Sequence, residues 1–229
     1  MKSLLITLLG LVLVACQSNT QDNVELKTQK DTVSYAIGTD IGKNLKEQQI
    51  EINAAALVRG ISEAIAGGKK TLTDQQIQEC MGQFQKDLAA KAHEKAMALG
   101  EKNKTEGESF LTQNKSKEGV KTTASGLQYT VITMGTGPKP KPEQTVTLNY
   151  KGTLIDGTEF DNTYTRGQPI TFGVAAMPKG WVEGLQLMPV GSKFTFYVPS
   201  ELAYGPAGAG GAIPPNATLI LEVELLAVK

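Results

Sequence analysis

The chain has little of what many enzyme active sites are built from, because it contains one histidine, His93, and two cysteines. A zinc-binding helix needs a second histidine four residues after the first, and Met97 stands at that position. Without another imidazole, a serine or cysteine nucleophile has no histidine to take its proton. The composition excludes a histidine-based metal centre, and we expect no metal, no cofactor and a solvent-facing His93.

An excess of charge of one sign is also absent. Lysine plus arginine and aspartate plus glutamate each total 23, so the formal net charge is zero and the electrostatic footprint of a nucleic-acid binder is missing. The glycines at positions 205, 208, 210 and 211 lack the Lys-Ser/Thr ending that a phosphate-binding loop requires. We expect no nucleotide site and no nucleic acid among the partners.

The first sixteen residues have the features of an export signal. Residues 4–15 form an apolar run that is too short to span a bilayer as a mature helix. The run ends in Leu13-Val-Ala-Cys16, which resembles the lipobox of bacterial lipoproteins; a plain secretory signal with a chance cysteine is the alternative. The resemblance implies lipidation at Cys16 and attachment by a lipid anchor only. Because residue 17 is Gln rather than Asp, it also implies an outer-membrane lipoprotein that faces the periplasm.

Two short helices are expected before residue 70. Residues 17–30 are polar and lack periodicity, which is typical of a flexible tether. From residue 31 to 45, apolar side chains recur at three- and four-residue spacing, which predicts an amphipathic helix. Asn53 is placed to cap a second helix that runs to Ala66, and Gly67-Gly68 is expected to end it through a left-handed turn.

A third, longer helix is expected to open at the capping box Thr73-Asp-Gln-Gln76. Its apolar face runs to Leu88, and Cys80 within this pattern is predicted to be a buried thiol, with an intermolecular disulfide as the alternative. After Leu88 the apolar face fades into alanine, lysine and glutamate, so we expect the rest of the helix to run through water as an arm. The two short helices and the first half of the third cannot bury much apolar surface by themselves, so we expect them to pair with a second copy of the chain. A self-contained helical subdomain is the alternative.

The sequence pattern of the C-terminal half predicts β-strands. Alternating or β-rich segments lie at residues 123–132, 146–154, 194–198 and 219–225, and Asp156-Gly157 is a strong hairpin signal. One short helical stretch is expected near residues 181–187. The predicted fold class is α+β: an antiparallel sheet wrapped on a short helix, preceded by an all-α domain with a long connecting helix.

Four clusters between residues 120 and 229 resemble the FKBP-type peptidyl-prolyl cis-trans isomerases. They are Leu148-Asn-Tyr150, Glu159-Phe-Asp161, Lys179-Gly-Trp181 and the segment from Glu201 to Thr218. The helical half resembles the N-terminal region of Mip-like members through Ser34-Tyr-Ala-Ile-Gly38, and in those proteins this region forms a homodimer. The resemblance implies a signal peptide at residues 1–16, a tether at 17–30, a helical dimerisation domain at 31–118 and an isomerase domain at 119–229.

The resemblance also implies a role for individual residues. Trp181 matches the floor of the prolyl pocket, Tyr150 and Phe160 match its aromatic walls, Asp161 matches a polar residue near the twisting carbonyl, and Tyr204 matches a donor to a substrate carbonyl. The further substrate-binding positions are Arg166, which pairs with the aspartate in the family, and Ile170, Phe172, Met177, Ile213 and Leu221. Ile170 and Leu221 replace common aromatic residues, which should widen the pocket.

The prolyl isomerisation that the resemblance implies needs no metal, no nucleophile and no histidine base. Rotation about an X-Pro amide meets a barrier of about 18–20 kcal/mol, and a dry pocket with fixed polar groups can favour the twisted amide. Pro178 stands where family members carry an isoleucine whose N–H donates to ligand, and proline has no N–H, at a cost of about 1–2 kcal/mol. The expected substrates are proline-containing unfolded or exported polypeptides. A dimeric peptide-binding chaperone with weak or no catalysis is the alternative.

Overall fold

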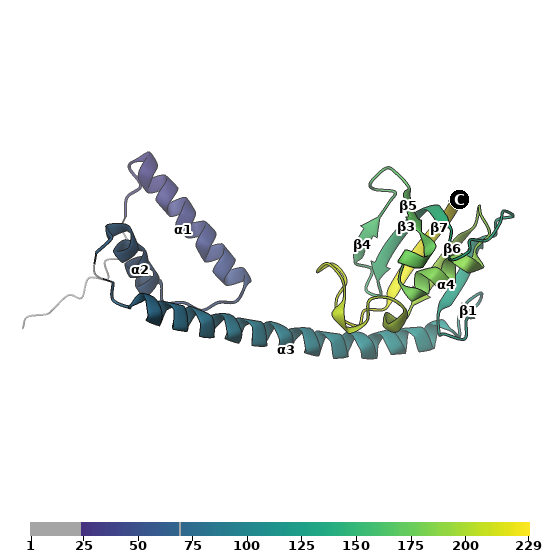
Figure 1. Cartoon of the computed structure of the whole chain (residues 1–229), viewed down its shortest axis with the longest axis horizontal. Coiled ribbons are helices and arrows are strands. Elements are labelled where there is room, and N and C mark those ends of the chain that lie inside the picture. Colours follow the sequence, from purple (N-terminus) through teal and green to yellow (C-terminus); the bar gives the residue numbers. More distant parts are fainter. Residues whose placement is uncertain (1–23, 69) are drawn as a thin grey trace, which may run out of the picture. The chain divides into compact units, whose positions relative to one another are not determined.

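The protein divides into two compact units in the computed structural model, one that ends at Asp74 and one from Gln75 to Lys229 (Figure 1). The structure describes residues 24–68 and 70–229. The predicted signal peptide, the lipidation position Cys16 and the tether up to residue 23 lie outside the described residues.

The first unit contains α1 (Gln29–Glu47) and α2 (Ala54–Ala66). Thr28 caps α1 in a capping box, in which its hydroxyl accepts from the Asp31 N–H at 3.2 Å and Asp31 Oδ2 accepts from the Thr28 N–H at 2.8 Å. The cap and the stop predicted for α2 are confirmed, since Asn53 Oδ1 accepts from the Ala56 N–H and Gly67 has a φ of 65°. Neither helix buries a residue within the single chain. The apolar faces predicted from their periodicity are therefore uncovered in one copy.

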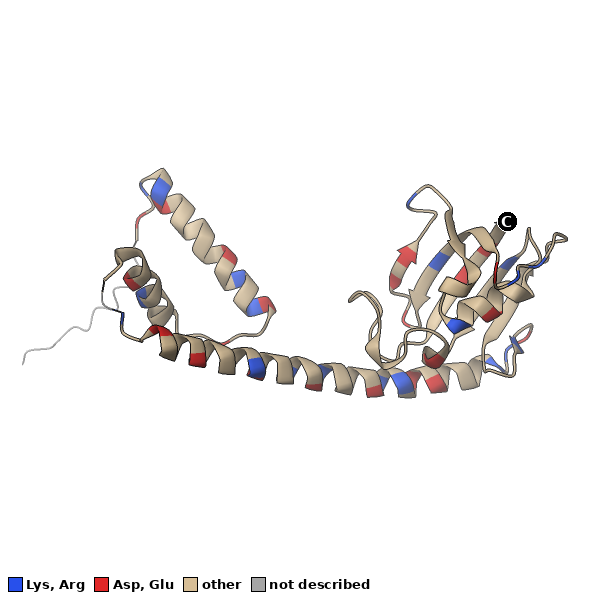
Figure 2. Cartoon of the chain, viewed as in Figure 1, with Lys and Arg blue, Asp and Glu red and all other residues tan. Residues whose placement is uncertain are grey.

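The long helix α3 runs from Asp74 to Asn114. Acidic and basic residues are interspersed along it (Figure 2). His93 is exposed, as predicted, whereas Cys80 is exposed and the prediction of a buried thiol is wrong for the single chain. The prediction that the helix runs through water beyond Leu88 is also wrong for its last third. Gly100, Gly107 and Asn114 are buried, because this part of α3 packs against the sheet unit.

The sheet is antiparallel throughout, and its central strands are β6, β7 and β3 in the order β1-β2-β6-β7-β3-β4, with β5 paired to β3. This confirms the predicted fold class. The strands are β1 (Lys121–Thr122), β2 (Gln128–Thr133), β3 (Thr145–Leu154), β4 (Glu159–Asn162), β5 (Ile170–Gly173), β6 (Lys193–Val198) and β7 (Leu219–Val228).

The core lies between this sheet and α4 (Lys179–Leu187). Alternate residues of β3, β6 and β7 point inward, as the period of two requires, and each buried Leu or Phe contributes about 1.5–3 kcal/mol. Gly184 allows α4 to approach closely, because a Cβ there would lie 2.8 Å from the Phe196 ring. Short 3₁₀ turns at Val174–Ala176, Ser200–Leu202 and Gly205–Ala207 complete the loops at this end of the sheet. α4 thereby holds Trp181 and Leu185 in the core.

Candidate active site

Trp181 forms the centre of an aromatic cluster at the start of α4. Its side chain is 5% exposed. The Tyr150 ring of β3 meets it edge-on, with centroids 5.1 Å apart and planes at 89°, and the Phe172 ring of β5 does the same at 6.0 Å and 89°. Edge-to-face contacts of this kind fix ring orientation beyond what burial alone does. The indole, carried by α4, is therefore held by ring contacts from β3 and β5.

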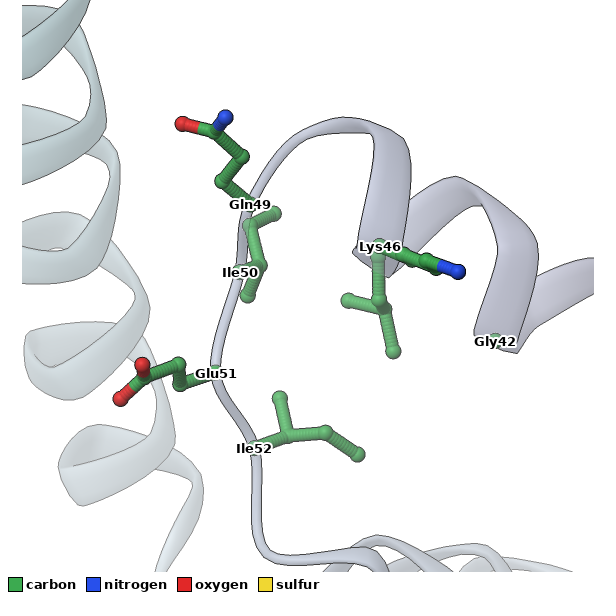
Figure 3. Close-up of a pocket in the computed structure, with 7 residues that line it drawn as sticks. Gly42, Lys46, Gln49, Ile50, Glu51 and Ile52 are labelled. Carbon is green, nitrogen blue, oxygen red and sulfur yellow. The ribbon is translucent and has the colours of Figure 1, made fainter.

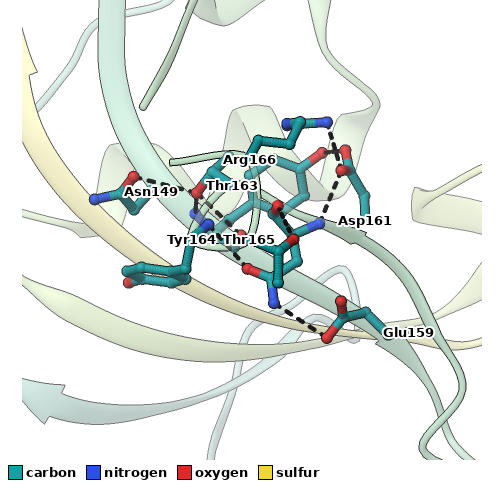
Figure 4. Close-up of polar contacts among 9 residues, drawn as sticks. Asn149, Glu159, Asp161, Thr163, Tyr164, Thr165 and Arg166 are labelled. Atoms are coloured by element: carbon teal, nitrogen blue, oxygen red, sulfur yellow. Dashed lines mark hydrogen bonds and ion pairs between the residues drawn. The ribbon is translucent and has the colours of Figure 1, made fainter. Parts of the chain in front are cut away.

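A polar cluster lies beside these rings, centred on the Asp161 carboxylate of β4 (Figure 4). The Tyr150 hydroxyl donates to Asp161 Oδ2. Arg166 Nη1 donates to Oδ1 at 2.6 Å, and the Asn162 backbone N–H donates to the same oxygen at 2.8 Å. Three donors thus fix the carboxylate, whose side chain is 28% exposed and so remains partly in contact with water.

Tyr150 remains a hydrogen-bond donor over a wide pH range. Burial raises the pKa of its phenol, and the hydrogen bond to Asp161 raises it further, while Arg166 acts in the opposite direction. At neutral pH the Tyr150 phenol is therefore protonated, and it lies with Arg166 around the Asp161 side chain. This set can orient and polarise an amide; it contains no activated nucleophile.

The backbone of Tyr150 is held by Thr163, a residue that the sequence reasoning missed. The buried Thr163 hydroxyl accepts from the Tyr150 N–H at 2.9 Å and donates to Asn149 Oδ1 at 3.2 Å, and the Thr163 N–H donates to the Tyr150 carbonyl at 2.9 Å (Figure 4). The run Asn162-Thr-Tyr-Thr was the available signal, because such side chains bond to nearby backbone in turns. Asn162 does so, since its Oδ1 accepts from the Tyr164 N–H at 2.9 Å.

Phe160 lies over β3 at a position that only glycine permits. A Cβ atom on Gly152 would stand 2.5 Å from two atoms of the Phe160 ring. Gly152 pairs with Asp161, and the register of β3 and β4 shifts next to it. The ring of Phe160 therefore lies directly over Gly152 of β3.

The remaining predicted site residues share one apolar cluster, except Tyr204. Trp181, Ile213 and Leu221 belong to the buried core, and the half-buried residues packed against it include Tyr150, Phe160, Ile170, Phe172 and Met177. Leu221 of β7 is 1% exposed in the single chain. Tyr204 is 37% exposed on the loop between β6 and β7, next to Gly205, whose carbonyl accepts from the Asn216 N–H at 2.8 Å.

Pro178 begins α4. Its φ of −54° suits proline, and its carbonyl accepts from the N–H groups of Trp181 at 2.9 Å and Val182 at 3.1 Å. The preceding amide, on Met177, donates to the Val174 carbonyl at 3.2 Å. Pro178, three residues before Trp181, therefore supplies an acceptor to the helix and no donor to the site.

A hollow of about 460 Å³ lies in the first unit, where α1 turns toward α2 (Figure 3). Three of its residues, Leu45, Ile50 and Ile52, are apolar, and Lys46 and Glu51 carry opposite charges. It holds none of the predicted site residues. Within residues 24–68 and 70–229, no group of three or more His, Cys, Asp or Glu is arranged to hold a metal. None of the described helices is both long enough and apolar enough to cross a bilayer.

Known proteins match this chain over most of its length. A model of the domain amino-terminal to FKBP-type peptidyl-prolyl isomerase matches residues 30–131, and a model of FKBP-type peptidyl-prolyl cis-trans isomerase matches residues 137–226. The outer membrane protein MIP of Legionella longbeachae is 46% identical over 229 residues, which are 100% of this chain and 98% of that protein. The peptidyl-prolyl cis-trans isomerase Mip of Coxiella burnetii is 41% identical, with 89% of each chain covered.

A solved structure is similar to this chain over most of its length. The crystal structure of FkpA from Escherichia coli superposes with a TM-score of 0.72 at 40% identity, covering 90% of this chain and 99% of that chain. Identity at this level over nearly complete chains, with both domain models matched in order, leaves the family in no doubt. The chain belongs to the FKBP-type peptidyl-prolyl cis-trans isomerases, in the group that carries a helical domain before the isomerase domain.

Proposed function

We propose that the protein accelerates cis–trans isomerisation of X-Pro bonds in unfolded or exported polypeptides, through the site around Trp181. The observation that carries this proposal is the joint placement of a buried indole, two edge-on rings and a fixed carboxylate. The catalytic residues proposed are Tyr150, Phe160, Asp161, Trp181 and Tyr204. The residues proposed to complete the substrate pocket are Arg166, Ile170, Phe172, Met177, Ile213 and Leu221.

In the mechanism, the prolyl ring lies against the face of Trp181 and the preceding carbonyl approaches the polar cluster. The planar amide is more dipolar than the twisted one, so an apolar surrounding costs the ground state more than the transition state. The carboxylate of Asp161, held by Tyr150 and Arg166, needs no reorganisation as the carbonyl rotates. Slow X-Pro rotation limits folding over tens of seconds, so such catalysis serves newly exported chains.

A protease-free isomerisation assay with a proline-containing peptide tests the proposal. We expect wild-type protein to accelerate the reaction and Asp161→Ala to lose most of that acceleration. Asp156→Ala is the matched control, because Asp156 is an exposed aspartate on the adjoining hairpin that accepts only a local turn bond from Thr158. A folded wild-type protein without any acceleration would refute the proposal.

The first unit is proposed to pair with a second copy, so that residues 31–118 serve dimerisation and residues 119–229 serve isomerisation. Support comes from α1 and α2, on which Val33, Ile37, Val58, Ile61 and Ile65 are at least 43% exposed in the single chain. A helix pair that buries none of its residues needs a partner to cover such a face. Sedimentation equilibrium should give a dimer, and Ile61→Glu should shift it toward monomer.

Attachment to the outer membrane through a lipid on Cys16 is proposed from the lipobox resemblance. The name of the Legionella longbeachae relative, an outer membrane protein, supports this location. Mass spectrometry of the native protein should find an acylated cysteine as the first residue. Cys16→Ser should release the protein from the membrane fraction.

The second candidate function is binding of unfolded chains without catalysis. The exposed apolar residues of the first unit and the missing donor at Pro178 favour it. Suppression of client aggregation that survives in the Asp161→Ala, Tyr204→Ala double variant would show that binding is separate from isomerisation.

A further inference from the structure

The last third of α3 carries a seam of three buried residues spaced seven apart. Gly100, Gly107 and Asn114 are the residues of α3 that the helix buries, and a spacing of seven is about two turns, which places all three on one side. Figure 1 shows this part of the helix beside the loops that lead into β7. The seam is thus a contact between α3 and the sheet unit, and two of its members have no side chain.

The two glycines allow α3 to touch the segment 215–218. A Cβ on Gly100 would lie 3.2 Å from both Asn216 Nδ2 and Pro215 Cβ, and a Cβ on Gly107 would lie 2.3 Å from Thr218 Oγ1. Two hydrogen bonds span the same contact. Asn103 Nδ2 donates to the Pro215 carbonyl at 2.8 Å, and Asn216 Nδ2 donates to the Gly100 carbonyl at 3.2 Å. The segment is therefore bonded to α3 in both directions.

The C-terminal end of the seam is fixed independently. Asn114 Nδ2 donates to Gln128 Oε1 at 3.0 Å, and Gln128 Nε2 donates to the Leu111 carbonyl at 2.8 Å. Both side chains are buried, so these bonds are shielded from competition by water. The anchor at β2 sets where the helix lies, and the glycines then meet segment 215–218 at a defined distance.

Asn216 connects this contact to two proposed pocket residues. It has a φ of 54°, a left-handed conformation that asparagine tolerates better than most residues. Its backbone N–H donates to the Gly205 carbonyl at 2.8 Å, directly after Tyr204. On its other side, Pro214 and Pro215 link it stiffly to Ile213, which exchanges backbone bonds of 3.0 and 2.9 Å with Ala209.

Packing alone does not hold this segment in place. A cavity of about 60 Å³ lies between α3 and the loops, with Asn103, Pro214 and Thr218 in its lining. Because that side of Pro214 is not filled, the hydrogen bonds of Asn103 and Asn216 add to the restraint that the contact at Gly100 provides. Their loss should let the segment shift without unfolding the sheet.

We propose that Asn216 is a positioning residue, held by α3 through the Gly100 carbonyl, while Gly107 lets the helix meet Thr218 of the same segment, so that Tyr204 and Ile213 face the substrate. This inference rests on the proposed isomerase function. It assigns to the C-terminal third of α3 a part in shaping the pocket, although α3 contributes no residue to it. The alternative is that the seam contributes to the stability of the unit as a whole.

The test uses the full chain solubilised in detergent, with isomerisation of a proline-containing tetrapeptide and amide hydrogen exchange as the two readouts. Asn216→Asp keeps the size and the tolerance of positive φ but replaces the donor to the Gly100 carbonyl. Gly107→Ala pushes against Thr218 Oγ1, and Thr218→Ala in the same chain removes that atom. Gly82→Ala is the matched control. Gly82 lies on the same helix, and a Cβ atom there meets nothing within 4 Å.

We expect Asn216→Asp and Gly107→Ala each to lower kcat/KM by about fivefold, the factor that one neutral hydrogen bond represents. Exchange should quicken at the amides of Ile213 and Asn216 and stay unchanged in β3 and β7. Thr218→Ala should restore the Gly107→Ala protein. In a Tyr204→Phe background Asn216→Asp should cost much less than fivefold, because both changes act through one hydroxyl.

Three results would overturn the proposal. The first is that Asn216→Asp and Gly107→Ala both keep the kcat/KM and the hydrogen exchange of the wild type. The second is that exchange quickens uniformly over the whole sheet. The third is that the losses in kcat/KM from Asn216→Asp and from Tyr204→Phe multiply in the double variant. A wild-type protein that does not isomerise the peptide would refute the proposed function instead. In that case the exchange pattern alone decides whether α3 holds Asn216 and Ile213.

Discussion

The phenol of Tyr150 on β3 donates a hydrogen bond to Asp161 Oδ2 on the neighbouring strand β4. The same ring meets Trp181 edge-on at 5.1 Å. Tyr150 is therefore the residue through which the apolar floor and the polar cluster are joined. Its ring and its hydroxyl serve different parts of the site, and substitution can separate them.

Tyr150→Phe should keep the ring contact with Trp181 and lose the bond to the carboxylate. Because Asp161 is partly exposed, water replaces some of the lost bond, and we expect a loss of about 1 kcal/mol in the free energy of unfolding. Peptide turnover should fall about fivefold, since Asp161 loses one of its orienting donors. Tyr150→Leu removes both functions and should cost more on both measures. Equal activity of wild type and Tyr150→Phe would show that the hydroxyl plays no part in catalysis.

Alkaline titration should show that Tyr150 and Tyr164 ionise late, because the pKa of each phenol is raised. Burial is the main cause that raises the pKa of Tyr150, and likewise that of Tyr164, whose hydroxyl donates to Glu224. A raised pKa means that the folded state holds the proton more tightly. The stability gained is fully present below pH about 10, the ordinary tyrosine value, and is lost as pH rises through the folded pKa. Ultraviolet titration should show one late phenolate fewer in Tyr150→Phe and one fewer in Tyr164→Phe, and a wild-type protein whose tyrosines all ionise near pH 10 would contradict this.

The sequence predicted the sheet, the helix caps and the aromatic cluster because these features follow strong local rules. Asn53 and Gly67 end α2 as expected, and the alternation of β6 and β7 matches their burial. The family clusters single out Tyr150, Asp161 and Trp181, and in the structure Tyr150 contacts both of the other two.

The sequence could not predict packing contacts that are made by glycine and polar residues rather than by apolar side chains. The last third of α3 was expected to be solvated because its apolar face ends at Leu88. It is docked instead by Gly100, Gly107 and Asn114, and hydropathy periodicity does not register glycines or asparagine as an interface. Thr163 was missed because the run Asn162-Thr-Tyr-Thr indicates side-chain bonds to nearby backbone but not that the Thr163 hydroxyl is buried.

Gly152→Ala should displace Phe160 from the border of the site. The added methyl group would stand 2.5 Å from the ring, closer than van der Waals contact allows, and the half-buried ring is free to rotate outward while the backbone stays. We expect kcat/KM to fall about fivefold, as for the loss of one aromatic contact of about 1 kcal/mol. Gly173→Ala on β5 is the control, because its Cβ meets nothing within 4 Å and should leave turnover unchanged. Full activity of Gly152→Ala would mean that Phe160 is dispensable.

Pro178→Ile should strengthen binding of a proline-containing peptide. The substitution restores a backbone N–H at the residue that starts α4, and isoleucine accepts the φ of −54° and ψ of 152° found there. The Pro178 carbonyl keeps its bonds from Trp181 and Val182, so the helix start is preserved. A gain of about 1 kcal/mol is about a fivefold lower Kd by calorimetry, against a loss of about 0.4–1 kcal/mol in stability because proline restrains the unfolded chain. Pro178→Ala restores the N–H without the larger side chain, so it should show the same gain. Tighter binding in Pro178→Ile alone would assign the effect to the side chain, and no gain in either variant would mean that this amide is not a ligand donor in this protein.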